Sequence, residues 1–332
     1  MSRSLKSLVA CLTISLGLAV TAEASAHKLR IATLAPKNSS WGKVFVKWQK
    51  KIKKKTDGAL ELEVYFNAVQ GNEDSMVSKM KTGQLDGAAL TALGLSQIYK
   101  NVLVLQLPGI VDSWENLDKV RASMQTEIEE GFDKEGFRIL GWGDVGLSRQ
   151  FSKGFAIKRP SDVKGKRPLV WRNEPVGPLV YSLIGGVVPV PLGVPEVLPA
   201  LRSGTINIIN APALAAEQLQ WTPNLDHVGA NVTVCAIGGT IFRKKALDDL
   251  PSDVRDKFDA LQKKAAKKSS KKIRKLDAEA YERIAKKMTV VDLSDDDKKE
   301  WEKILRKAVQ KLAQGTYPKE LVDRVVKLTG KS

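Results

Sequence analysis

The chain has 332 residues, and its 54 lysine and arginine residues against 37 acidic residues give a formal charge of +17. Hydrophobic residues make up 43% of the chain, which suffices for a packed core and excludes global disorder. Two cysteines and two histidines are too few for a disulfide scaffold, a Cys/His zinc module or most histidine-centred catalysis.

Residues 1–26 have the pattern of a secretory signal peptide. A basic start precedes a short apolar run, and Ala24-Ser25-Ala26 has the small–x–small form of a cleavage site. Because the run is shorter than the roughly 20 residues of a membrane span, we expect export to the periplasm. Cys11 resembles a lipobox cysteine, but the apolar run continues after it, which disfavours a lipid anchor. Cleavage would leave 52 basic and 36 acidic residues, a formal charge of +16.

The first half of the remaining chain alternates strands and helices. We predict strands at 28–34, 60–66 and 87–90, and helices at 40–55 and 74–82. This β–α–β–α–β order indicates an α/β fold with a mostly parallel sheet.

A second copy of this order follows. We predict strands at 169–171, 187–190 and 206–210, and helices at 176–184 and 196–202. In both copies a helix ends at a glycine, and a short turn then leads into a strand. The repetition indicates two similar lobes.

Long β-rich segments at 137–155 and 232–242 suit connections between the lobes. A lysine-rich helix is expected over 251–288, and a final helix over about 295–314. The cysteine left after cleavage, Cys235, lies in an apolar stretch where burial would protect its thiol.

Basic residues cover most of the helix circumference in 263–275, which is typical of a solvated helix face. The run lacks interleaved aromatic residues and the protein is expected to be exported, so nucleic-acid binding is disfavoured. An acidic partner or anionic lipid head groups remain open.

Catalytic motifs are absent from the sequence, which contains no HExxH, GxSxG, P-loop or paired CxxC. Asp144 and Glu174 could serve as a general acid and base, but nothing in the sequence places them together. We therefore expect a binding protein, not an enzyme, with no cofactor and no metal.

Several motifs together resemble the periplasmic solute-binding proteins of TRAP transporters, typified by C4-dicarboxylate and sialic-acid binders. Their order and spacing along 27–325 carry the resemblance. The motifs are Ile31-Ala-Thr-Leu-Ala-Pro36 with Ser40-Trp41, Lys79-Met-Lys-Thr-Gly-Gln-Leu-Asp-Gly87, Arg159-Pro-Ser-Asp-Val-Lys-Gly165, Gly185-Gly-Val-Val-Pro-Val-Pro191, Pro195-Glu-Val197 and Ala200-Leu-Arg-Ser-Gly204.

The resemblance implies a two-lobed periplasmic binding protein fold, with two βαβ lobes, hinge strands and a long bracing helix. It implies that a small organic ligand is captured in the cleft between the lobes and delivered to membrane permease subunits. By this reading, lobe I comprises 27–148 and about 238–265, and lobe II comprises 149–237 and about 290–332. The bracing helix is about 251–288.

One position departs from the family pattern. An arginine that pairs bidentately with a ligand carboxylate is typical of the family, and ungapped alignment from Asp162 places Leu169 there. Arg167 and Arg172 are nearby, but neither is a clean substitute. Because leucine favours apolar surface over a carboxylate, the chain looks closer to a branch thought to bind hydrophobic ligands and associated with TPR-repeat partners.

The resemblance also implies a set of ligand-binding candidates at strand ends around the cleft. Arg149 aligns with a second family arginine and could anchor the ligand, or could form an interlobe salt bridge with Asp144. Trp142 and Trp171 could equally pack inside the lobes. The expected set is Trp41, Thr91, Trp142, Asp144, Arg149, Leu169, Trp171, Asn210, Ala211 and Pro212.

The sequence therefore predicts a TRAP-type binding protein for a largely apolar ligand. Two alternatives stay open. One is a carboxylate binder that uses Arg149 or Arg167, and the other is a periplasmic lipid carrier or partner-binding protein.

Overall fold

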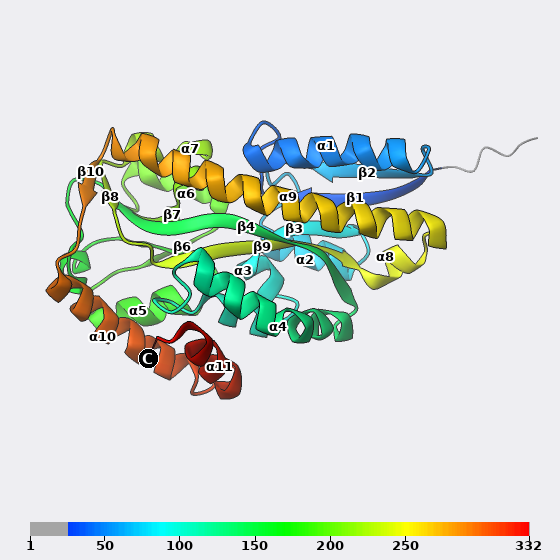
Figure 1. Cartoon of the computed structure of the whole chain (residues 1–332). Helices are drawn as coiled ribbons and strands as arrows, with labels where there is room; N and C mark the ends of the chain where they lie inside the picture. The colour runs from blue at the N-terminus through cyan, green and yellow to red at the C-terminus, as the bar shows by residue number, and fades with distance from the viewer. Residues whose placement is uncertain (1–25, 332) are drawn as a thin grey trace, which may run out of the picture.

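A computed structural model describes residues 26–331 of the chain (Figure 1). The predicted signal peptide, apart from its last residue, lies outside the described residues.

The first βαβαβ unit forms as the sequence predicts, with boundaries shifted by one residue or less. Strand β1 (His27–Thr33) pairs in parallel with β2 (Leu60–Tyr65) and with β3 (Gly87–Thr91). Helices α1 (Ser40–Lys55) and α2 (Glu73–Lys81) connect them. The Ser39 hydroxyl, which accepts from the backbone N–H of Gly42, caps α1.

The second unit has the predicted order, but its strands form two separate pairings. β5 (Leu169–Trp171) pairs in parallel with β6 (Val190–Leu192), which starts three residues later than predicted. β7 (Ile208–Pro212) pairs antiparallel with β4 instead. Helices α5 (Val176–Ile184) and α6 (Val194–Ser203) connect these strands, and Gly204 ends α6 in the left-handed conformation.

Two long antiparallel strands run across the middle of the molecule. β4 (Phe137–Ser152) pairs with β9 (Val234–Arg243), and β9 also pairs with β3 (Figure 1). Short strands β8 (His227–Gly229) and β10 (Thr289–Val291) complete an eight-stranded sheet. These strands therefore join the first unit to the second.

The long helix α9 (Ser252–Ala285) packs along β4 and contacts both α1 and α7 (Ala213–Gln218). Its buried Asp277 accepts hydrogen bonds from the backbone N–H groups of Leu147 and Leu214, at 2.8 and 2.9 Å. Beside it, Gly146 has φ +150°, and a Cβ there would come within 2.6 Å of the Asp277 carboxylate. α9 is thereby fixed to β4 where the strand bulges.

The C-terminal end corrects one predicted boundary. Helix α10 (Asp295–Leu312) packs against α5, but α11 (Lys319–Thr329) packs against α4 (Trp114–Lys134) and the 3₁₀ segment η1 (Lys100–Gln106). The prediction that the whole of about 290–332 joins lobe II is therefore wrong for α11. The sequence predicted neither α4 nor α11.

The remaining elements are short, and the core is divided among several apolar clusters. Cys235 is fully buried, as expected, and burial raises the pKa of its thiol to about 12. None of the helices within 26–331 is both long enough and apolar enough to cross a bilayer. The short elements are α3 (Ala92–Ser96), η2 (Pro160–Val163), η3 (Thr222–Asn224) and α8 (Lys244–Asp248).

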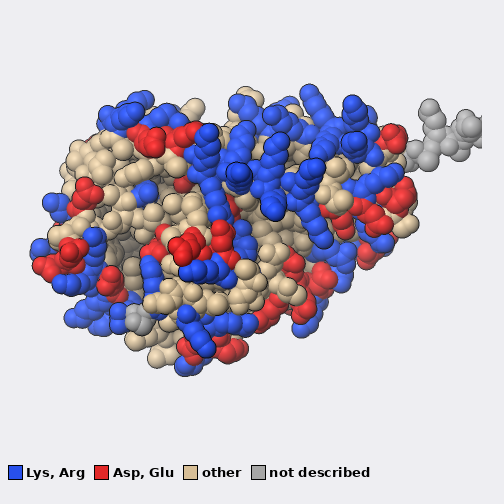
Figure 2. Space-filling view, in the orientation of Figure 1, with Lys and Arg blue, Asp and Glu red and all other residues tan. Residues whose placement is uncertain are grey.

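Exposed lysines gather over α1 and α9, which lie against one another (Figure 2). None of the eleven lysines that define this basic face has an ion pair among residues 26–331. They are Lys43, Lys47, Lys50, Lys51 and Lys54 of α1, and Lys263, Lys264, Lys267, Lys268, Lys271 and Lys272 of α9.

Candidate functional site

A cavity of about 1570 Å³ opens between the two βαβ units, above the central strands β4 and β9. It is lined by strand ends and by the loops that follow them, including those after β1, β3, β5 and β7. The volume exceeds the roughly 300–1,000 Å³ of ordinary ligand pockets, as a cleft between two lobes would.

Aromatic and aliphatic side chains from both units form much of the wall. Trp41 at the start of α1, and Leu169 and Trp171 of β5, line the cavity as the sequence predicts. Trp171 also packs against Trp221, with 6.2 Å between the ring centroids. Ala211 and Pro212 line it from the end of β7, where both are buried.

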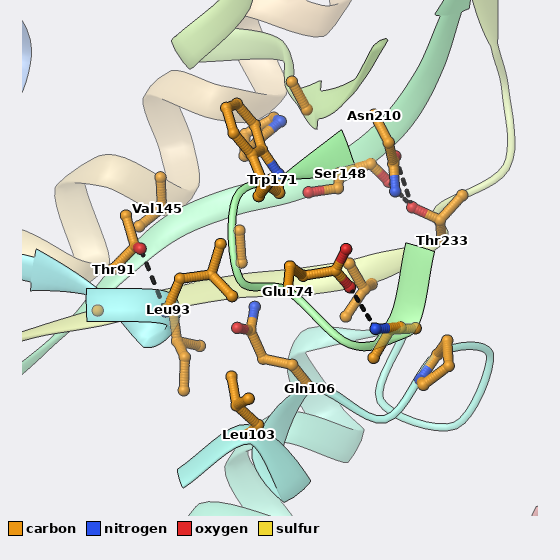
Figure 3. A pocket seen from close by; sticks show the side chains of 18 of the residues that line it. Thr91, Leu93, Leu103, Gln106, Val145, Ser148, Trp171, Glu174, Asn210 and Thr233 are labelled. Carbon is orange, nitrogen blue, oxygen red and sulfur yellow. Dashed lines mark hydrogen bonds between the residues drawn. The ribbon is translucent and has the colours of Figure 1, made fainter. Parts of the chain in front are cut away.

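Two predicted polar residues face the cavity from equivalent strand ends (Figure 3). Thr91 ends β3, and its hydroxyl donates to the Glu73 carboxylate at 2.7 Å. Asn210 lies in β7, and its side-chain oxygen accepts from the Thr233 hydroxyl at 2.8 Å. Because Asn210 lines the cavity and its amide nitrogen carries two donors, it can donate to a ligand.

Trp142 belongs to the wall more than to the open site. Its ring is 8% exposed and sits in the apolar cluster of the first unit. Its indole N–H donates to Glu129 of α4 at 2.7 Å. Trp142 therefore packs within the first unit and also lines the cavity.

Asp144 touches the cavity, but both of its carboxylate oxygens are occupied. They accept from Arg121 of α4 and from Arg274 of α9, each at 2.6 Å, and the side chain has no exposed surface. The expected ligand contact and the expected pair with Arg149 are both corrected. Asp144 instead ties β4 to the two helices that flank it.

Arg149 points away from the cleft, which corrects its prediction as a polar anchor. Successive side chains of a strand alternate, and Ser148 and Gln150 are the neighbours that line the cavity. The Arg149 guanidinium lies 3.9 Å from the ring centre of Tyr281 on α9 and donates to the carbonyl of Ala230. Burial lowers the pKa of its guanidinium.

The two arginines near Leu169 are also occupied. Arg167 is outside the cavity lining, and its guanidinium donates to the Gly204 carbonyl at 2.9 Å. Arg172 lines the cavity but pairs with both oxygens of Glu196, at 2.8 and 2.9 Å. Neither Arg167 nor Arg172 therefore substitutes for an arginine at the position that Leu169 occupies.

The sequence did not place Glu73, Glu174 or Tyr317 in the cleft, but all three line it. Glu174 projects from the turn after β5 into the same space as Gln106 (Figure 3). The only sequence signal is that each glutamate follows an asparagine just before a helix, Asn72-Glu73 and Asn173-Glu174. The third, Tyr317, lies beyond the last helix that the sequence predicted.

The acidic side chains of the described residues neither form a metal cluster nor bring the candidate acid and base together. Within 26–331, no group of three or more His, Cys, Asp or Glu side chains could hold a metal ion. Asp144 and Glu174, considered above as an acid and base pair, are held separately by arginines and by backbone amides.

Two βαβ units, long connecting strands and a cleft between them define a two-lobed periplasmic binding protein. Residues 31–316 match the bacterial extracellular solute-binding proteins of family 7 (DctP), and the chain belongs to this family. Its members are binding receptors that lie outside the cytoplasm and work with membrane permease subunits, not enzymes.

Relatives and solved structures agree with this assignment. The chain is 25% identical over 269 residues to a solute-binding protein of Verminephrobacter eiseniae, covering 80% of each chain. It is 25% identical over 265 residues to the C4-dicarboxylate-binding periplasmic protein DctP of Rhodobacter capsulatus, covering 76% of each. A TRAP solute-binding protein of Sulfurospirillum deleyianum with bound succinate superimposes with a TM-score of 0.84 at 18% identity, covering 91% of this chain and 99% of that one.

Proposed function

We propose that this receptor captures an organic ligand with a largely apolar body in the cleft and delivers it to TRAP permease subunits. The observation that carries the proposal is the presence of Leu169 in the wall of the cleft. It is 5% exposed, it lines the cavity, and it stands where the resemblance places the carboxylate-binding arginine. A carboxylate buried against leucine would lose its charge-assisted pair, at a cost of several kcal/mol.

The wall of the cleft supports the same conclusion. Trp41, Leu169 and Trp171 offer apolar surface from both units. A ligand that buries roughly 300 Å² of apolar surface would gain about 7 kcal/mol before the costs of association. The cavity volume of about 1570 Å³ exceeds that of ordinary ligand pockets. We therefore expect the lobes to close around the bound ligand.

A second candidate is a carboxylate receptor, since the Sulfurospirillum deleyianum neighbour holds succinate. Arg149 and Arg167 are turned away from the cleft, so this candidate would require Arg172 to leave Glu196. A TPR-repeat partner and a lipid-carrier role rest on the resemblance alone. The predicted lobe boundaries, apart from α11, remain a prediction.

The test is to purify the exported protein, record its mass under native conditions, and identify by mass spectrometry what an organic extraction releases. We expect a ligand with an extended apolar body. Recovery of succinate or another small dicarboxylate would contradict the proposal.

A further inference from the structure

Two of the carboxylates that line the cleft, Glu73 and Glu174, have no cationic partner among residues 26–331. Glu73 accepts from the Thr91 backbone N–H and hydroxyl, at 2.5 and 2.7 Å. Glu174 accepts from the backbone N–H groups of Val176 and Gly177, at 2.9 and 2.8 Å. Burial raises the pKa of both carboxyls against these hydrogen bonds, that of Glu174 to about 7. Each carboxylate can still accept from a ligand, since it has more lone pairs than these partners use.

The two carboxylates come from opposite sides of the cleft. Glu73 begins α2 of the first unit, and Glu174 precedes α5 of the second. Their neighbours in sequence meet, because the Asn173 side-chain amide donates to Asp74 at 3.1 Å. A ligand between the units would therefore be approached by both.

Tyr317 is an independent observation that points to a ligand. Its ring is 3% exposed and lines the cavity. Its hydroxyl is buried and has no hydrogen-bond partner among residues 26–331. Burial, followed by the charge of Glu174, raises the pKa of this phenol, and both side chains line the same cavity. Burial of a polar group without a hydrogen-bond partner destabilises the protein, so a ligand that bonded to this hydroxyl would remove that cost.

The cationic side chains around the cavity do not offset these acids. Four of the five that line it within 26–331 are paired with carboxylates, and the fifth, Arg306, is exposed on α10. The four pairs are Arg172–Glu196, Lys298–Asp295, Lys319–Asp323 and Lys331–Asp112.

We propose that Glu73, Glu174 and Tyr317 form a head-group site for the hydrogen-bond-donating end of the ligand, a protonated amine or a hydroxyl. The site selects against a carboxylate end, because two acids line it and four of the five cationic side chains around the cavity are already paired with acids. This inference rests on the proposed function, since it assigns the polar end of a ligand whose body is apolar.

The test compares three probes that share one apolar body, 3-phenylpropylamine, 3-phenylpropan-1-ol and 3-phenylpropanoate. Binding to the ligand-stripped protein is measured by calorimetry at pH 8, where Glu174 is ionised. We expect the amine to bind at least about tenfold more tightly than the carboxylate, since charge-assisted hydrogen bonds are the strong ones. The alcohol should fall between them.

Two variants locate the effect. Glu174→Gln keeps an acceptor for the Val176 and Gly177 amides and should abolish the preference for the amine over the alcohol. Tyr317→Phe removes only the unpartnered hydroxyl and should weaken the amine and the alcohol by about threefold or more. Glu302→Gln, an exposed carboxylate on α10 at the cavity rim, is the matched control and should change nothing.

The outcomes separate this inference from the function beneath it. Tightest binding by the carboxylate, or an unchanged ranking in Glu174→Gln, would overturn the head-group site and leave the apolar cleft standing. Failure of all three probes to bind would overturn the apolar cleft, and the head-group site with it.

Discussion

The basic face over α1 and α9 and the cleft between the two units have opposite electrostatic characters. On the outer face, lysines stand without acidic partners and keep their charges in water (Figure 2). Around the cleft, Arg172 and Arg274 are paired with acids and Arg149 is turned away, while Glu73 and Glu174 have no cationic partner within the described part of the chain. The large positive charge of the chain therefore says nothing about the charge its ligand should carry.

The two regions differ because the outer face is fully exposed to water and the cleft is partly shielded from it. Exposed lysines cost little, since water and salt screen their repulsion. Such a face produces a long-range field that favours approach to anionic surfaces or partners. In the cleft a charge is less well hydrated and needs a partner, and four of the five cationic side chains that line it within 26–331 are paired with carboxylates.

The largest expected effect comes from breaking the buried charge cluster beneath the cleft. Asp144→Asn would leave Arg121, 12% exposed, and Arg274 without their shared carboxylate. We expect the free energy of unfolding, measured by urea denaturation, to fall by about 3 kcal/mol. Asp118→Asn removes the exposed partner of Arg274 and should cost less than about 1 kcal/mol. Equal losses would mean that Asp144 is no more structural than a surface acid.

A second change would reverse the charge preference of the cleft. Leu169→Arg places a guanidinium where the resemblance expects one, beside a cavity with room for it. We expect succinate binding, measured by calorimetry, to strengthen at least tenfold, since a bidentate pair with a carboxylate contributes about 1.5–3 kcal/mol. Leu169→Gln, polar but uncharged, should not give this gain. An unchanged succinate affinity in Leu169→Arg would show that another feature excludes carboxylates.

Glu174 should also make stability depend on pH. Its pKa of about 7 in the folded chain lies above its ordinary value of 4.5, so the folded state holds a proton that the unfolded state releases. The free energy of unfolding should therefore fall as pH rises from about 4.5 to about 7, and level off above that. Glu174→Gln should remove about 1–2 kcal/mol of this decline, a value reduced for the solvent in the cavity.

Urea denaturation at pH 5 and pH 8 measures that difference, with Glu302→Gln as the control. The phenols of Tyr181 and Tyr317 have raised pKa values and do not titrate in this range. A parallel pH dependence in wild type and Glu174→Gln would refute the prediction.

The smallest effect concerns the basic face. Lys263, Lys267 and Lys271 follow one another at four-residue spacing on α9, where like charges repel. Lys267→Glu would replace two repulsions by two attractions and raise the free energy of unfolding by about 0.5–1 kcal/mol at low salt. Lys267→Gln should give about half of this. If the gain persisted in 1 M NaCl, its origin would not be electrostatic.

Local patterns in the sequence predicted most of the elements of the two units. Helix α1 begins at a serine cap and ends in three lysines, and β5 and α5 fall at the predicted residues. Capping, periodicity and glycine punctuation act within a few residues, so they can be read without the tertiary fold. Helix α11 was missed, and its placement against α4 depends on contacts about 200 residues apart in the sequence.

The candidate site, like the fold, could be predicted only in part from the sequence. The sequence alone determined the repeated units, the position of Leu169 and the excess of lysine. Only the tertiary structure decided which polar groups face the ligand, because that depends on the register of β4 and on partners from distant helices. The alternation of side chains along β4 turns Arg149 toward Tyr281. Arginines of α4 and α9 bind both carboxylate oxygens of Asp144. A hydrogen bond between Asn173, in the turn after β5, and Asp74 of α2 brings the neighbours of Glu73 and Glu174 together at one cleft, which no local pattern encodes.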